Sequence, residues 1–176
     1  MTDLQRREQA LTALLEEDAC RRLISCYSAA VDWADRESLA GIFWPDARFD
    51  FGTAFFVGSG ATGLDFLIGS VNASLCRTHT LGSTWLTVGN GEARAETPAV
   101  NIWISRNPDG SFTRYFFTAR YLWELRKRRE EWRISSLKIL ITTAQCTPYD
   151  LGAQPPGFQL LEGLGVDHPL FPGAHS

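Results

Sequence analysis

The apolar residues in the first part of the chain recur at steps of three and four, as on one face of a helix. This stripe spans residues 11–33 and consists of Leu11, Leu14, Leu15, Ala19, Leu23, Ile24, Tyr27, Ala30 and Val31. The acidic run "EED" at 16–18 predicts a break in the helix. Asp35 is a typical N-cap for a second, short helix, which must end by Trp44 because Pro45 disfavours helical geometry in the residue before it.

The rest of the pattern combines one more helix with extended segments. Residues 46–60 alternate around Phe49 and Phe51 and contain a glycine turn, which predicts a hairpin. Helical spacing returns over 63–75 and then gives way to a period of two. From 77 to 144 this alternation is interrupted at "GNGE", "NPDG" and "KRREE", which predicts four successive antiparallel strands. The order indicates an α+β fold class, with a curved, mostly antiparallel sheet wrapped around N-terminal helices.

The tail from residue 147 differs in composition from the domain that precedes it. It is rich in proline and glycine but keeps five large apolar residues, Phe158, Leu160, Leu161, Leu164 and Phe171. Disordered tails seldom carry so many such residues. We therefore expect one domain over 1–146 and an extension over 147–176 that packs on a pocket or a neighbouring subunit. His168 and His175 are expected to be solvated or at a subunit contact.

Composition and charge narrow the range of partners. The chain has 176 residues, of which 44% are hydrophobic and 21% charged, as in one globular domain with a sizeable core. Its net charge of -3 is scattered, and the basic cluster at 126–130 is short, so nucleic acid is not an expected partner. No run of eighteen apolar residues and no cleavable leader pattern is present, which predicts a cytoplasmic protein without a membrane partner.

The motifs for metal ions and nucleotide cofactors are missing from the sequence. The four cysteines, Cys20, Cys26, Cys76 and Cys146, form no CxxC pair and no metal-ligand spacing, so neither a disulfide nor a zinc site is expected. The GxGxxG and P-loop patterns are also missing, so we expect no cofactor. Cys26 and Cys76 are weak candidates for a nucleophile.

One carboxylate and one imidazole occupy positions that point toward the predicted core. Asp32 ends the apolar stripe of the helix, and His79 lies in the alternating run "CRTHTLGSTW". Burying an unpaired carboxylate costs several kcal/mol, roughly enough to demand a partner. Paired, the carboxylate would fix the imidazole tautomer while the other ring nitrogen takes a proton from a substrate. The alternative is a structural histidine, with Asp32 capping the turn before Asp35.

Arg77 and Tyr27 are the other candidates for chemistry. Arg77 lies two residues before His79, on the same strand face, where a guanidinium could hold a phenolate, a carboxylate or a developing oxyanion. An ordinary ion pair at the start of the strand is its alternative. Tyr27 faces the core and could donate a hydrogen bond to a departing hydroxyl or a carbonyl, or simply pack there.

The chain is rich in aromatic residues, which would suit a cavity for a flat apolar or aromatic ligand. Most of these rings must belong to the core. The residues predicted to line a substrate site are Trp44, Phe49, Phe51, Trp85, Asn101, Trp103, Phe117 and Tyr121.

Three segments together resemble the SnoaL-like branch of the nuclear transport factor 2 superfamily. They are "YSAAVDWADRESLAGIFWPDARFDF", "RTHTLGSTW" and "ARYLWELRKRREEWRISSLKI". The resemblance covers residues 17–143, and its specificity lies in the order and spacing of the motifs. It implies a cone-shaped α+β barrel, open at one end, with an apolar pocket between the helices and the sheet. The family's Asp and His dyad matches Asp32 and His79.

The resemblance also limits the function. Some dehydratases of this family carry a second histidine on the strand matching "AVNIWISR", where this chain has Asn101 and Trp103. The family implies a homo-oligomer, a trimer rather than a dimer, and it includes non-catalytic members.

From these residues we expect a cofactor-independent lyase for a hydrophobic, aromatic small molecule. His79, held by Asp32, would remove a proton while Arg77 or Tyr27 assists the loss of water, another leaving group or a small carbonyl fragment. The family resemblance implies a more specific form of this reaction, the loss of formaldehyde from a lignin-derived aromatic dimer. The alternatives are an isomerase or cyclase of ketosteroid or polyketide type, and a non-catalytic subunit like the small subunit of ring-hydroxylating dioxygenases.

Overall fold

The first helix is longer than the sequence pattern predicts. In the computed structural model, which describes residues 1–72 and 74–153, α1 runs without a break over Asp3–Asp32. The predicted break at 16–18 is wrong, because this acidic run contains neither glycine nor proline and Glu16 makes contacts of its own. Thr2 and Gln5 form a capping box at the helix start.

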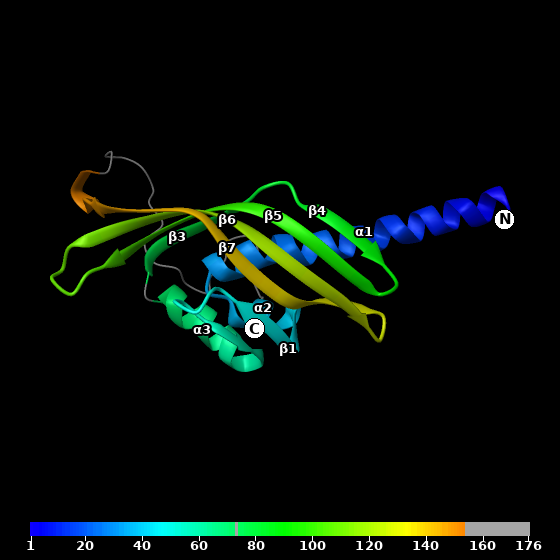
Figure 1. The fold of residues 1–176 in the computed structure, drawn as a ribbon, viewed down its shortest axis with the longest axis horizontal. Helices are drawn as coiled ribbons and strands as arrows, with labels where there is room; N and C mark the ends of the chain where they lie inside the picture. The colour runs from blue at the N-terminus through cyan, green and yellow to red at the C-terminus, as the bar shows by residue number, and fades with distance from the viewer. Residues whose placement is uncertain (73, 154–176) are drawn as a thin grey trace.

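Only the second half of α1 is buried. Its buried residues are Cys20, Ile24, Tyr27, Ala30 and Val31. Leu11, Leu14 and Leu15, which the periodicity places in the same stripe, are each more than half exposed. Figure 1 shows why: the first turns of α1 project beyond the sheet, and only the later turns lie beneath it. The prediction that these three leucines are core residues is therefore wrong.

The remaining elements follow the predicted order. α2 (Arg36–Ile42) begins at the cap Asp35, whose carboxylate accepts from the Ser38 backbone N–H at 2.9 Å. β1 (Phe43–Asp50) and β2 (Val57–Ser59) form the predicted hairpin, followed by α3 (Gly60–Asn72). The strands β3 (Ser74–Leu81), β4 (Trp85–Gly89), β5 (Glu92–Arg106), β6 (Phe112–Arg128) and β7 (Glu131–Tyr149) complete the sheet. A short 3₁₀ turn, Leu151–Ala153, ends the described part.

The sheet is mixed and open. Its order is β2-β1-β7-β6-β5-β3, with β4 also paired to β5. Of the pairings between described strands, that of β1 with β7 is parallel and the others are antiparallel. The long strands arch over α1, and α3 lies beside β1 (Figure 1). The predicted fold class, an α+β cone with a curved, mostly antiparallel sheet, is confirmed, although the strands within residues 1–72 and 74–153 do not close into a complete barrel.

The first of the four predicted strands is divided in two. Residues 82–84 leave the ladder between β3 and β4, and both strands pair with β5. The Gly82 N–H donates to the Pro98 carbonyl at 2.8 Å, so this glycine lies close against β5. A Cβ at Gly82 would come within 3.0 Å of the Pro98 ring, which leaves little space for another residue there.

The core fills the concave side of the sheet. Its largest fully buried side chains include Tyr27, Phe43, Phe49, Tyr121 and Trp123. Phe49 packs directly under α3, because a Cβ built on Gly63 would meet the Phe49 ring at 2.1 Å. Among the helices in the described part of the chain, none is both long enough and apolar enough to cross a lipid bilayer.

The boundary predicted between 146 and 147 falls within β7, which continues to Tyr149. Residues 154–176, which hold most of the predicted extension and both His168 and His175, lie outside the described residues. The extension therefore stays a prediction.

Glu16 connects α1 to the hairpin formed by β6 and β7. Its carboxylate accepts from Lys127 Nζ at 2.9 Å and from the Trp132 indole N–H. Both hydrogen bonds lower the pKa of Glu16, and the one from Lys127 has the larger effect. Because folding lowers the pKa of Glu16, its ionised carboxylate stabilises the folded protein at pH values above about 4.3, the pKa of glutamate in an unfolded chain. This stabilisation is lost as the pH falls through the pKa that Glu16 has in the folded protein.

We therefore expect Glu16→Gln to lower the melting temperature at pH 7, and the difference from the wild type to shrink below about pH 4. Thermal unfolding from pH 7 to pH 3 measures this. Glu8→Gln, on an exposed turn of the same helix, is the matched control and should leave the melting temperature unchanged. A difference that persists at pH 3 would contradict this role for the Glu16 charge.

Candidate active site

Asp32 and His79 meet where the end of α1 lies against β3. The Asp32 Oδ1 atom lies 2.6 Å from His79 Nδ1, and Oδ2 accepts from the His79 backbone N–H at 2.9 Å. Among the strands of the described part of the chain, β3 pairs with β5 alone, so this N–H on its other side is available to the carboxylate. One carboxylate thus holds both the ring and the backbone of His79. The two side chains are only 13% (His79) and 18% (Asp32) exposed.

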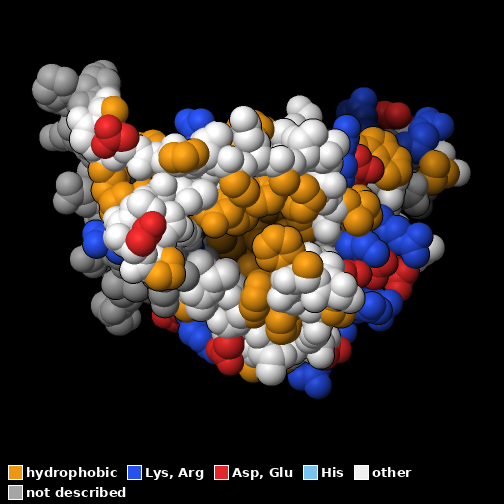
Figure 2. All heavy atoms as spheres, turned by 60° about the vertical axis from the view of Figure 1, so that its left-hand side comes forward, with side chains coloured by type: hydrophobic (Ala, Val, Ile, Leu, Met, Phe, Trp, Pro, Cys, Tyr) orange, Lys and Arg blue, Asp and Glu red, His pale blue; other side chains and the backbone are white. Residues whose placement is uncertain are grey.

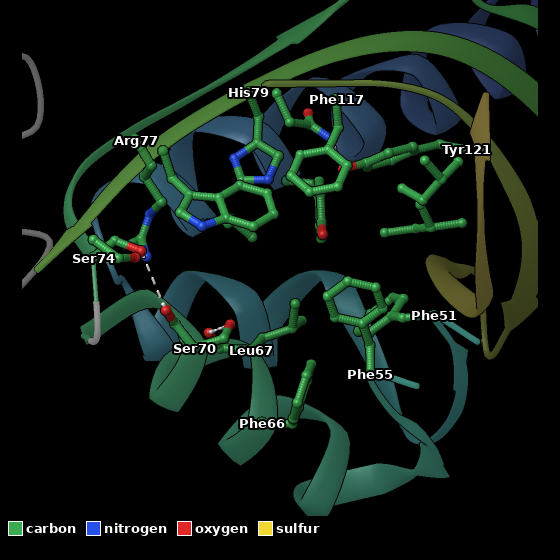
Figure 3. Close-up of a pocket in the computed structure, with 17 residues that line it drawn as sticks. Phe51, Phe55, Phe66, Leu67, Ser70, Ser74, Arg77, His79, Phe117 and Tyr121 are labelled. Atoms are coloured by element: carbon green, nitrogen blue, oxygen red, sulfur yellow. Dashed lines mark hydrogen bonds between the residues drawn. The ribbon is translucent and has the colours of Figure 1, made fainter. Parts of the chain in front are cut away.

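This geometry assigns the ring nitrogens. A carboxylate can only accept hydrogen bonds, so the proton of a neutral His79 ring must lie on Nδ1. Nε2 then carries the lone pair and can accept a proton. His79 lines a cavity, as Figure 3 shows, so a ligand in the cavity can meet this nitrogen. The arrangement is that of a general base with its orienting carboxylate.

Arg77 lies on the same face of β3 and is 94% buried, with 6% of its surface exposed. Its Nη2 donates to the Asp32 backbone carbonyl at 3.3 Å, while Nε and Nη1 have no partner among the described residues. Burial lowers the pKa of Arg77 to about 10, and the Asp32 charge opposes this shift. The guanidinium therefore stays charged at neutral pH, in the wall of the cavity.

The cavity has a volume of about 370 Å³ and is mostly apolar. It opens on one face of the molecule as a hydrophobic hollow (Figure 2). Its lining consists of Tyr27, Val31, Phe51, Phe55, Phe66, Leu67, Ser70, Ser74, Arg77, His79, Asn101, Trp103, Ser105, Phe117, Tyr121, Ile139 and Ile141. In Figure 3, Arg77, Ser70 and Ser74 lie toward one end, whereas Tyr121 and Phe51 lie toward the other.

Two buried phenols face this cavity. Burial raises the pKa of Tyr27 well above its ordinary value, and burial also raises that of Tyr121. Both hydroxyls are therefore neutral and can act as hydrogen-bond donors at neutral pH. Tyr121 Oη accepts from Asn101 Nδ2 at 2.9 Å, and Asn101 Oδ1 has no partner among the described residues. The Tyr27 and His79 rings are edge to face, with their centroids 6.4 Å apart.

The structure brings most of the sequence-predicted residues to the cavity. Asp32 lies behind His79, and Tyr27, Arg77, Phe51, Asn101, Trp103, Phe117 and Tyr121 join His79 in the lining. Their roles in catalysis and binding stay predictions.

Three predicted lining residues lie elsewhere. Trp44 is on the outer side, where its indole N–H donates to the Arg126 carbonyl and its ring stacks against the guanidinium of Arg128. Phe49 is fully buried beneath α3, and Trp85 is 67% exposed on a surface away from the cavity. The structure therefore corrects the predicted lining: Trp44 makes a contact on the outer side, Phe49 belongs to the core, and Trp85 lies on the surface.

Sequence reasoning missed a group of lining residues on α3 and β7. Phe66, Leu67 and Ser70 come from α3, and Ile139 and Ile141 come from β7. The alternation of Leu137, Ile139 and Ile141 was a usable signal, because residues two apart share one strand face. The same spacing points to Ser105, which shares a face of β5 with Asn101 and Trp103. No such pattern distinguishes Ser70 or Ser74 as lining residues.

The cysteines do not join the site. Cys76 is adjacent to Arg77, but it is not part of the lining, and burial raises the pKa of its thiol. Burial raises the pKa of Cys20 to about 12. A thiol with a raised pKa is a poor nucleophile at neutral pH. Within residues 1–72 and 74–153, no three His, Cys, Asp or Glu side chains are grouped closely enough to hold a metal ion.

Comparison with known proteins gives a family and a fold. The family model described as "SnoaL-like domain" matches residues 12–138. No curated protein sequence is significantly similar to the chain.

Solved structures with the same fold include an NTF2-like protein with a cystatin-like fold from Novosphingobium aromaticivorans, at 23% identity and a TM-score of 0.68, covering 81% of this chain and 92% of that one. A type 2 hexachlorocyclohexane dehydrochlorinase (LinA) has 20% identity and a TM-score of 0.68, covering 89% and 100%. A scytalone dehydratase-like protein from N. aromaticivorans has 18% identity and a TM-score of 0.64, covering 86% and 99%. At these identities the likeness establishes the fold.

Proposed function

The chain belongs to the SnoaL-like domain family, and from this premise we propose that it is a cofactor-independent lyase acting on a hydrophobic, aromatic small molecule. The observation that carries the proposal is the 2.6 Å contact between Asp32 and His79 at the wall of an apolar cavity. Two of the structural neighbours are named as a dehydrochlorinase and a scytalone dehydratase-like protein, and both names describe eliminations.

The proposed reaction moves a proton and a leaving group. His79 Nε2 takes a proton from the substrate, and the Asp32 carboxylate stabilises the imidazolium that forms. The electron pair left behind expels water or another leaving group, which Arg77 or Tyr27 assists by hydrogen bonding. The imidazolium then returns its proton to the leaving group or to water, so that the protein ends the cycle unchanged.

Loss of formaldehyde from an aromatic dimer is the more specific form of this proposal. A phenolic substrate first loses water, made up of its benzylic hydroxyl and its phenolic proton, to give a quinone methide. His79 then takes the proton of a primary alcohol, the adjacent C–C bond breaks, and formaldehyde leaves. The electron pair of that bond passes into the quinone methide to give a phenolate, which becomes the phenol when the His79 imidazolium returns its proton through water. The aromatic lining, which includes Phe51, Trp103 and Phe117, suits such a substrate.

Product mass is the test of this proposal. The protein, without any added cofactor, is incubated with hydroxylated aromatic monomers and dimers, and the products are analysed by mass spectrometry and formaldehyde trapping. A lyase gives products lighter than the substrate, and His79→Asn abolishes them. Products of unchanged mass would mean an isomerase or cyclase, which needs the same base. If no substrate is converted and none exchanges hydrogen with deuterated solvent, the site is not catalytic and the proposal fails.

A further inference from the structure

We infer that the cavity recognises a planar aromatic ligand carrying a carboxylate and a hydroxyl, with Arg77 binding the carboxylate and Asn101 accepting from the hydroxyl. This inference deepens the proposed function, since it names the substrate class of the same site. It rests on two polar groups whose hydrogen-bonding capacity the fold leaves unused on either side of His79.

Arg77 supplies a charge that the protein itself does not fully satisfy. Its guanidinium is buried, yet within residues 1–72 and 74–153 its one hydrogen bond goes to the Asp32 backbone carbonyl. Both oxygens of the Asp32 carboxylate are taken by His79. A buried charge with unused donors costs several kcal/mol unless a partner arrives, on the general scale for such groups. The cavity is where such a partner can enter, because Arg77 lines it together with Ser70 and Ser74.

Asn101 supplies an acceptor in the same way. The residue is 4% exposed, its Nδ2 donates to Tyr121 Oη, and its Oδ1 has no partner among the described residues. A ligand hydroxyl can donate to this oxygen. Since a hydroxyl can also accept, the pairing does not depend on which way the amide is turned.

Strand register fixes the spacing of the two groups. His79 lies opposite Asn101 in the antiparallel pairing of β3 with β5, and Arg77 lies opposite Trp103. Arg77 and Asn101 are therefore diagonal neighbours on the face that lines the cavity, with Cα atoms roughly 7–8 Å apart. Because both residues line the same cavity, one small aromatic molecule with a polar group at each end can contact both.

The wall between these groups is built for a flat ring. Trp103 and Phe117 stack with centroids 4.5 Å apart and an interplanar angle of 11°, and Tyr115 continues the stack on Trp103 at 5.2 Å. Phe51 and Phe66 form part of the opposite wall. Such surfaces favour stacking of an aromatic ligand over binding of an aliphatic acid.

The test measures binding of three ligands by isothermal titration calorimetry. They are para-coumarate, which has both groups, para-coumaramide, which replaces the carboxylate by a neutral amide, and cinnamate, which lacks the hydroxyl. We expect para-coumarate to bind about 10- to 100-fold more tightly than the amide, as for hydrogen bonds to charged groups. The loss of the hydroxyl should cost about 3- to 10-fold. Equal binding of the acid and the amide to the wild type would overturn the inference without any variant.

Variants assign each preference to its residue. Arg77→Met should erase the preference for the acid over the amide, and Asn101→Leu should erase only the preference for the hydroxyl. Arg120→Met is the matched control, since Arg120 pairs with Glu96 on the exposed side, and it should keep both. His79→Asn should also keep both. If His79→Asn, rather than Arg77→Met, loses the preference for the acid, the imidazole ring binds the anion and the inference is wrong.

These ligands separate the inference from the proposed function. None of the three carries a leaving group for the proposed elimination, so their binding does not require a reaction. If the preferences appear but no lyase product is found, the proposed function fails alone. If lyase products form from neutral substrates and the acid has no advantage over the amide, the inference fails alone.

Discussion

Replacing His79 by asparagine should lower turnover by about 10²- to 10⁴-fold, the contribution expected of a general base. Asparagine can still donate a hydrogen bond to Asp32, but it has no basic nitrogen at the place of Nε2. The fold should survive, because the bond from the residue 79 backbone N–H to Asp32 does not depend on the side chain. Steady-state kinetics with a substrate found by product analysis, together with melting temperatures, measure both effects.

The companion variant Asp32→Asn tests the tautomer argument. An amide at position 32 can donate to Nδ1, which would move the ring proton to Nε2 and remove the lone pair that the substrate needs. Its turnover should therefore fall by a similar factor, even though the side chain keeps its shape. Asp65→Asn, on the exposed ion pair with Arg36, should keep wild-type turnover.

A loss of less than tenfold in a folded His79→Asn protein would contradict the role of His79 as the general base.

Replacing Phe49 by alanine should cost about 3–5 kcal/mol of stability, the usual range for removing a buried phenylalanine ring. Phe49 has no exposed surface, and it packs against Phe43, Phe51 and the backbone of Gly63. For a domain of this length the melting temperature should fall by about 10 °C. Thermal or urea unfolding measures the change.

Phe55→Ala is the control for this prediction. Phe55 is also a phenylalanine and lines the cavity, but it is 55% exposed, so its removal should change stability by less than about 0.5 kcal/mol. Phe49→Leu, which keeps most of the volume, should lose less than Phe49→Ala. If Phe49→Ala instead weakens ligand binding at unchanged stability, the ring belongs to the pocket, as the sequence pattern alone predicted.

The pair of Asp32 and His79 could be predicted because it depends on local periodicity. The end of an apolar helical stripe and the inward face of an alternating strand each fix the direction of one side chain. The family resemblance then brought the two segments together. The same reasoning places Arg77 on the face of His79, since residues two apart on a strand point the same way. Asn101 comes instead from the family resemblance, and Trp103 and Phe117 from the aromatic content of the chain.

The residues wrongly predicted to line the cavity are those whose side-chain direction depends on contacts between distant segments of the chain. Phe49 lies in β1 and Phe51 lies just beyond its end, two residues later. The position of α3 decides that Phe49 is covered while Phe51 reaches the cavity. The aromatic content predicts Trp85 in the lining, but the break at 82–84 separates β4 from β3, and Trp85 lies exposed on the surface. Trp44 precedes a register shift between Phe43 and Arg48 in the pairing with β7.

The length of α1 was misjudged for a similar reason. Charges at 16–18 suggested a break, yet Glu16 is held by Lys127 and Trp132, more than a hundred residues away in the chain. Such a contact leaves no signal near Glu16 in the sequence. The predicted homotrimer, the two-part domain organisation and the cytoplasmic location stay predictions.

The double contact between Asp32 and His79 has an evolutionary consequence. One of its two hydrogen bonds comes from the backbone of β3 and is available to any residue at position 79 other than proline. A lineage could therefore lose the imidazole by mutation and still keep helix and strand joined at the same place. A single fold can in this way give rise to descendants that bind without catalysing, because the backbone hydrogen bond that holds β3 to Asp32 does not require the imidazole that acts as the base.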